Sequence, residues 1–104
     1  MNKNLRTYTF VLSTLALMSC SKTPTACFTV DKGSGSTHVN EEIQYNALCS
    51  TEADSYAWNY GDGSSDSGPQ VKHKYRTAGS YTVQLTAKNS SKEASSTQTV
   101  VIVP

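Results

Sequence analysis

The sequence contains little charge and no excess of one sign. It has 9 Lys or Arg residues and 8 Asp or Glu residues among 104, and its formal net charge is +1. Two of the basic residues, Lys3 and Arg6, lie near the start, so the rest of the chain has slightly fewer basic than acidic residues and is not expected to carry a basic patch. Proteins that bind nucleic acid or anionic lipid headgroups electrostatically carry a clustered basic surface. We therefore expect no nucleic acid among the partners.

Side chains that commonly carry catalysis are also scarce. His38 and His73 are the 2 histidines of the chain and lie far apart in sequence. No serine occurs in a G-x-S-x-G pattern or beside a base that would activate it. Two distant histidines are also too few for a zinc site, which takes more ligands from the protein. We expect no enzymatic activity.

Apolar runs are short. Tyr8–Met18 is mostly apolar and follows the basic residues Lys3 and Arg6. The run falls far short of the ~20 residues that a membrane-spanning helix needs, but it fits the apolar region of a signal peptide. The chain is therefore expected to be exported.

The run ends in Leu17-Met18-Ser19-Cys20, which resembles a bacterial lipobox. An aliphatic residue stands three positions before a cysteine, and a small residue stands directly before it. The resemblance implies cleavage before Cys20, a diacylglycerol on its sulfur and an acyl chain on its amine. Several acyl chains hold a protein at a membrane far better than one. The alternative is an ordinary secretory signal with an incidental cysteine.

The lipobox interpretation divides the chain into three parts. Residues 1–19 are expected to be a lipoprotein signal peptide, 20–25 a lipidated tether, and 26–104 the folded domain. The protein would then be lipid-anchored in the cell envelope. Ser21 differs from the aspartate that retains lipoproteins in the inner membrane of enteric bacteria, which favours the outer membrane.

The chain has 3 cysteines, an odd number. If Cys20 carries lipid, Cys27 and Cys49 are the pair that remains. Small exported domains have thin cores and often add a disulfide. Closing this ~22-residue loop would contribute about 3 kcal/mol. The alternative is two buried free thiols, but the export signal favours the disulfide.

No window shows the spacing of an amphipathic helix, whereas apolar residues alternate in several short segments. Glu42–Cys49 places Ile43, Tyr45, Ala47 and Cys49 on one face, which predicts a disulfide that runs through the core. Further strands are expected at Cys27–Val30, Tyr56–Tyr60, Val71–Tyr75, Tyr81–Ala87 and Ser95–Val103, with turns or loops at Asp31–Ser36, Ser50–Asp54, Ser64–Gln70 and Asn89–Glu93. This pattern predicts an all-β fold, an immunoglobulin-like antiparallel β-sandwich of about seven strands.

Several spaced motifs occur in order along this pattern. Residues 58–63, WNYGDG, resemble the WDFGDG signature of PKD (polycystic kidney disease-type) domains. His73-Lys74-Tyr75 matches the H-x-Y of that family, and residues 78–85 match its (P/A)-G-x-Y-x-V-x-L. The resemblance covers about 26–104, and its signature positions are Trp58, Asn59, Tyr60, Gly61, Asp62, Gly63, Tyr75, Gly79 and Tyr81.

The chemistry of the residues at these positions predicts structural roles for them, independently of the family resemblance. Trp58 is the only tryptophan and is expected in the core. Gly61 and Gly63 allow positive φ at a tight bend, and Asp62 can accept hydrogen bonds from nearby N–H groups. Tyr81 has the position of a tyrosine corner, in which the hydroxyl bonds back to the chain.

Two signature positions differ from the family pattern. Asn59 replaces an aspartate and removes a carboxylate from the bend. Tyr60 replaces a phenylalanine and adds a hydroxyl that needs a partner. Some PKD domains bind calcium, and Asp54, Asp62 and Asp66 are expected near the same end of the sandwich. The D-x-x-x-D spacing of Asp62 and Asp66 is not the D-x-[DN]-x-[DN]-G of an EF-hand. A calcium site is therefore the weaker hypothesis, and ordinary turns are the alternative.

Two functions fit these observations. The first is a non-enzymatic surface module that binds protein or polysaccharide, which the resemblance favours. The second is a structural spacer or envelope assembly subunit with no ligand of its own. The outward residues of 81–88 are polar and fit either a hydrated contact with a ligand or simple exposure to solvent; they are Thr82, Gln84, Thr86 and Lys88. A fold alone does not choose between these functions.

Overall fold

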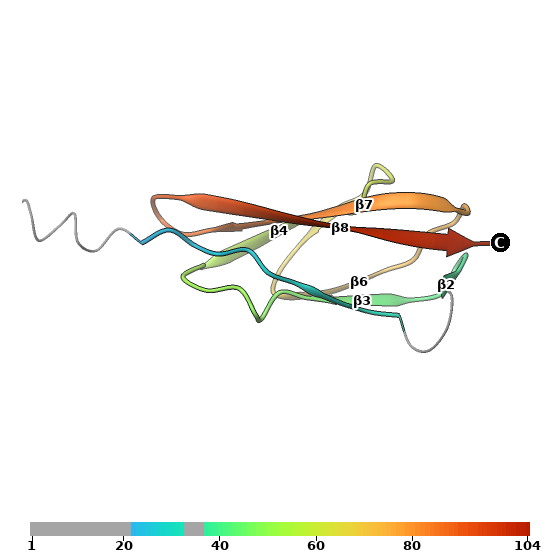
Figure 1. The fold of residues 1–104 in the computed structure, drawn as a ribbon, viewed down its shortest axis with the longest axis horizontal. Coiled ribbons are helices and arrows are strands. Elements are labelled where there is room, and N and C mark those ends of the chain that lie inside the picture. Colours follow the sequence, from blue (N-terminus) through green and yellow to red (C-terminus); the bar gives the residue numbers. More distant parts are fainter. Residues whose placement is uncertain (1–21, 33–36) are drawn as a thin grey trace, which may run out of the picture.

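The computed structural model describes residues 22–32 and 37–104. Two β-sheets pack face to face (Figure 1) and confirm the predicted all-β sandwich. One sheet has three strands in the order β1-β3-β6, and the other has five in the order β2-β8-β7-β4-β5. The strands are β1 Thr29–Asp31, β2 Thr37–His38, β3 Ile43–Asn46, β4 Ser55–Asn59, β5 Ser65–Ser67, β6 Gln70–His73, β7 Gly79–Lys88 and β8 Glu93–Val103.

The long hairpin of β7 and β8 forms the centre of the five-stranded sheet. Its register pairs Gly79 with Ile102 at one end and Lys88 with Glu93 at the other. Cross-strand partners share a face and neighbouring residues alternate between faces. Val83, Leu85 and Ala87 therefore point inward, as the alternation in 81–87 predicts, and all are buried.

Aromatic rings fill much of the space between the sheets. Trp58 on β4 lies at the centre, with its ring 5.2 Å from that of Phe28 and 5.7 Å from that of Tyr45. The indole N–H of Trp58 donates to the carbonyl of Gly68 at 2.8 Å, so its burial leaves no polar group unpaired. The predicted core role of Trp58 therefore agrees with its place in the structure.

Two strands differ from the sequence predictions. Ser64–Gln70 was expected to be a loop, but it contains β5, which pairs with β4 from Ala57↔Ser67 to Asn59↔Ser65. Its Ser-Asp-Ser sequence lacks the β-branched and aromatic residues that favour strands, and this edge strand forms because the neighbouring strand supplies its hydrogen bonds. No strand was expected at Thr37–His38, but these residues form β2, which pairs with β8 in parallel and so departs from the antiparallel prediction.

Residues 22–25, the second part of the expected tether, pack on the domain. Pro24 is buried, and Thr25 forms an isolated antiparallel bridge with Thr51. The Asn89 side chain, in the β7–β8 turn, donates to the carbonyls of Lys22 and Glu52 at 2.8 Å and 3.0 Å. Cys20 and Ser21 lie outside the described residues. Within the described part of the chain, no helix has the length and apolar character needed to cross a membrane.

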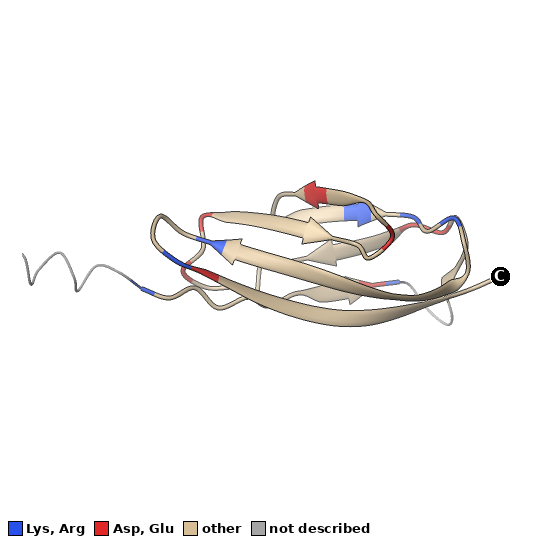
Figure 2. Cartoon of the chain, turned by 90° about the horizontal axis from the view of Figure 1, so that it is seen from above, with Lys and Arg blue, Asp and Glu red and all other residues tan. Residues whose placement is uncertain are grey.

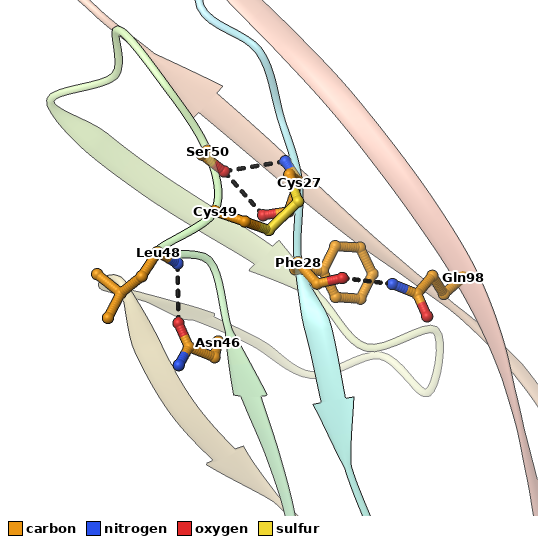
Figure 3. Close-up of a disulfide and its surroundings, with 7 residues drawn as sticks. All are labelled: Cys27, Phe28, Asn46, Leu48, Cys49, Ser50 and Gln98. Carbon is orange, nitrogen blue, oxygen red and sulfur yellow. Dashed lines mark hydrogen bonds between the residues drawn. A yellow bond between two sulfur atoms is a disulfide. The ribbon is translucent and has the colours of Figure 1, made fainter.

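The Cys27–Cys49 disulfide is present and closes a sequence separation of 22 residues. Figure 3 shows it joining the segment before β1 to the turn that follows β3. The Ser50 hydroxyl accepts from the N–H of Cys27 at 2.9 Å and donates to its carbonyl at 2.8 Å. The same segments are thus held by hydrogen bonds and by the covalent link.

The prediction that this disulfide runs through the core is wrong. Cys49 is exposed and Cys27 is only partly buried. The alternation that buries Ile43, Tyr45 and Ala47 stops there, because the chain turns at 47–50 with the N–H of Ser50 donating to the carbonyl of Ala47. The disulfide therefore lies beside the core.

Candidate functional site

The glycine–aspartate–glycine bend after β4 places Asp62 against His73 of β6. The Asp62 Oδ2 and His73 Nε2 atoms are 2.7 Å apart, and the two side chains are 21% and 15% exposed. Asp62 Oδ1 accepts the N–H of Ser64 at 3.0 Å, which is the predicted backbone hydrogen bond. The bend covers His73 and leaves it half-buried.

The His73 ring is held between two tyrosines. It stacks on Tyr60 with ring centroids 3.9 Å apart and meets the Tyr75 ring edge-on at 4.7 Å. The Tyr75 hydroxyl donates to the carbonyl of Tyr60 at 2.9 Å and lies 3.2 Å from the hydroxyl of Tyr45. These contacts fix β6 and the bend relative to each other.

The environment keeps Asp62 ionised and the tyrosines neutral. Burial alone would raise the pKa of Asp62, but the hydrogen bonds from His73 and Ser64 and the attraction of His73 lower it below its ordinary value. Burial raises the pKa of Tyr60, and the nearby Asp66 carboxylate raises it further. Burial also raises the pKa of Tyr75. The tyrosine hydroxyls therefore serve as hydrogen-bond donors and not as bases.

The remaining signature residues also have structural contacts. The Tyr81 hydroxyl donates to the carbonyl of Thr77 at 2.6 Å, which is the bond expected of a tyrosine corner. The added hydroxyl of Tyr60 donates to Asp66 Oδ2 at 3.3 Å. Asn59 Oδ1 accepts the N–H of Gly61 at 3.0 Å, so the amide holds the bend although it lacks a charge.

The carboxylates of the calcium hypothesis do not gather. Asp54 precedes β4 and its N–H donates to the carbonyl of Lys88, whereas Asp62 follows the other end of that strand. The expectation that the three acids share one end of the sandwich is therefore wrong for Asp54. Among residues 22–32 and 37–104, no group of three or more His, Cys, Asp or Glu side chains is arranged to hold a metal ion.

A surface depression lies beside the Asp62–His73 pair. We call it the basic depression, because it holds two cations, Lys74 and Arg76, that the sequence did not single out. Asn40, at its margin, donates its N–H to the carbonyl of Tyr75 at 2.8 Å. The residues that line it are Asn40, Asp62, Ser64, His73, Lys74, Arg76, Thr77 and Tyr81.

The outer face of the five-stranded sheet is rich in uncharged polar groups. Strand register places Asn59, Gln84 and Thr97 in one row across β4, β7 and β8. Figure 2 shows β7 and β8 without charged segments except at their shared turn, where Lys88 pairs with Glu93. We call this surface the hydroxyl face, and its polar members are Asn59, Ser65, Ser67, Thr82, Gln84, Thr86, Ser95, Thr97 and Thr99.

The fold and the bend agree with a known family, whose model, described as PKD domain, matches residues 27–103. The chain belongs to the PKD domain family. Domains of this family are non-catalytic accessory modules, and the Asp62–His73 pair fits that character because each partner holds the other in a structural contact. The resemblance seen in the signature positions is thereby confirmed.

Three relatives show what this PKD domain is similar to, and the chain spans only a small part of the first two. Collagenase ColA of Bacillus cereus is 41% identical over 69 residues, which are 62% of this chain and 7% of the collagenase. A solved structure of carbohydrate-binding modules from the β-sandwich superfamily has a TM-score of 0.71 and 26% identity, covering 79% of this chain and 35% of that one. The PKD1 domain of the Vibrio cholerae metalloprotease PrtV has a TM-score of 0.64 and 22% identity, covering 80% and 100%.

Proposed function

We propose that the chain is a lipid-anchored protein of the cell envelope, at the outer membrane, whose PKD domain binds a polysaccharide or an extracellular protein without catalysis. The observation that carries the binding role is the hydroxyl face, which offers hydroxyl and amide groups over several strands without a charge at its centre. Such a surface matches the neutral hydroxyls of a polysaccharide. The similarity to carbohydrate-binding modules and to a collagenase supports the same range of ligands.

Binding by a single domain is expected to be weak. Each hydrogen bond exchanged with water contributes about 1 kcal/mol net, and ordering the partners costs a large part of that gain. The described aromatic rings are buried or half-buried, so none offers a fully exposed platform on which a sugar would stack. We expect dissociation constants of about 1 mM. Many lipid-anchored copies on one membrane would raise the overall affinity through multivalency.

The anchor proposal also orients the domain. Two residue steps separate Cys20 from Lys22, a distance of at most about 7 Å. Lys22 is held at the β7–β8 turn by Asn89 and pairs with Glu52 at 3.5 Å. A lipid on Cys20 would therefore keep that end of the sandwich at the membrane. The end at which β8 finishes would then point outward (Figure 1).

The anchor is tested by the intact mass of protein extracted from membranes. We expect a product that begins at Cys20 and carries acyl chains, and a Cys20→Ser variant that carries none and leaves the membrane fraction. A soluble, unacylated product with a different first residue would overturn the anchor.

Binding is tested by affinity electrophoresis in gels that contain neutral polysaccharides and by sedimentation with fibrillar collagen. We expect Thr97→Lys, in the middle row of the hydroxyl face, to reduce binding at least about fivefold, because it places an unpaired charge against a neutral ligand. The matched control is Gln44→Lys, on an exposed position of β3 in the other sheet, which should bind as the unmodified protein does. Equal loss in both variants would remove the hydroxyl face as the site.

A spacer or assembly subunit is the second candidate function. It is favoured by the position of Lys22 and the C-terminus at opposite ends of the sandwich (Figure 1), which suits a unit that separates what is attached at each end. This function predicts no binding to any polysaccharide or to collagen, whichever variant is used.

A further inference from the structure

Two cations of the basic depression have no acidic partner. Lys74 and Arg76 flank Tyr75, which is buried and fixed by the hydrogen bond from its hydroxyl to Tyr60. Both cations are exposed, and neither forms an ion pair within the described residues. Three other lysines each pair with a glutamate on the surface (Lys22, Lys72 and Lys88).

The one carboxylate of the depression is already engaged. Asp62 lies 2.7 Å from the His73 ring nitrogen and accepts the N–H of Ser64. It therefore offsets only part of the charge of Lys74 and Arg76, and the depression keeps an excess of positive charge. The Asn40 amide and the Thr77 hydroxyl add neutral donors at its margin.

The bend after β4 links the depression to the hydroxyl face along the chain. Gly61 lies directly against the backbone of Thr82, since a Cβ on Gly61 would stand 2.6 Å from the Thr82 carbonyl oxygen. Ser64, which lines the depression, is followed by Ser65, the first residue of β5 on the hydroxyl face. A chain molecule on the hydroxyl face can thus extend into the basic depression.

We infer that the basic depression binds carboxylate or sulfate groups of an acidic polysaccharide whose neutral hydroxyls lie on the hydroxyl face. This inference rests on the proposed function and adds the chemical class of the ligand. Lys74 and Arg76 contact the acidic groups, and the hydroxyl face contacts the sugar hydroxyls. The contact is largely exposed, so it weakens as salt screens it over a Debye length of about 10 Å at 0.1 M.

The experiment compares matched acidic and neutral polymers by affinity electrophoresis at low salt and at about 0.5 M NaCl, where salt strongly screens exposed charges. Polygalacturonate is compared with its methyl ester, and dextran sulfate with dextran. Whichever acidic polymer is the source, we expect it to bind at least about tenfold more tightly than its neutral partner. The difference should vanish in the double variant Lys74→Gln/Arg76→Gln and at high salt.

The control variant Lys88→Gln/Lys92→Gln changes net charge equally but lies at the β7–β8 turn, so it should retain the preference. Equal binding of acidic and neutral polymers would overturn the inference while leaving the proposed function intact. Binding of none of the polymers would overturn the inference, and absence of binding to fibrillar collagen as well would overturn the proposed function. Poly-glutamate is tested in the same way. If it binds as tightly as the acidic polysaccharides and loses binding in Lys74→Gln/Arg76→Gln, the inference is overturned and the ligand is an acidic polypeptide.

Discussion

Replacement of Gly61 by alanine is expected to lower the free energy of unfolding by about 3 kcal/mol. Gly61 has a φ of +84°, where an L-residue costs roughly 1–2 kcal/mol. An added Cβ would also stand 2.6 Å from the Thr82 oxygen and 3.0 Å from its nitrogen. These are backbone atoms of the central hairpin, so relief requires a backbone shift, and overpacking of this kind costs about 1–3 kcal/mol. Urea unfolding followed by the fluorescence of Trp58 measures the loss.

Gly63 offers a matched control in the same bend. Its φ is +91°, but a Cβ there would meet nothing within 4 Å. Gly63→Ala should therefore cost only the conformational part, about 1 kcal/mol, offset in part because alanine restricts the unfolded chain. Equal losses at both positions would show that the close contact of Gly61 with Thr82 adds nothing measurable to the loss in free energy of unfolding. The positive φ would then be the sole reason for glycine at both positions.

The sequence predicted the sandwich because local patterns and tertiary structure agree at its centre. The alternation of Val83, Leu85 and Ala87 survives in β7, since both edges of that strand are hydrogen-bonded to neighbouring strands. Prediction failed at the edges. The alternation that ran to Cys49 ends at a turn, and the short strands β2 and β5 exist only through pairing with β8 and β4. Such pairing depends on residues far away in sequence.

The candidate site shows the same division. The bend, the tyrosine corner and the burial of Trp58 follow from residue types at fixed spacing. The Asp62–His73 pair joins residues 11 positions apart, one in the bend between β4 and β5 and the other in β6 of the opposite sheet, and no local pattern predicts it. Lys74 and Arg76 were missed because isolated cations on a surface carry no pattern. Their alternation with the buried Tyr75 is the one sequence signal that could have placed both on the same side.

Removal of the disulfide by Cys27→Ser/Cys49→Ser is expected to lower the free energy of unfolding by about 3 kcal/mol. The bond closes a loop with a separation of 22 residues, and the chain-entropy model assigns about that value to the restriction of the unfolded chain. For a domain of this size, the melting temperature should fall by roughly 12–24 °C. Calorimetry and urea unfolding measure the change, with the unmodified protein under reducing conditions as a second comparison.

The position of the disulfide makes this test informative. Because Cys49 is exposed and Cys27 only partly buried, serine at these positions leaves no large cavity, and the loss reports mainly on the unfolded state. The denaturant slope should rise, since an unclosed chain exposes more surface. Ser50→Ala is the matched control: it removes two hydrogen bonds to Cys27 but keeps the bond, and it should cost about 1–2 kcal/mol without changing the slope. A double-serine variant within about 1 kcal/mol of the unmodified protein would contradict the entropic role, and the hydrogen bonds of Ser50 would then be what holds these segments together.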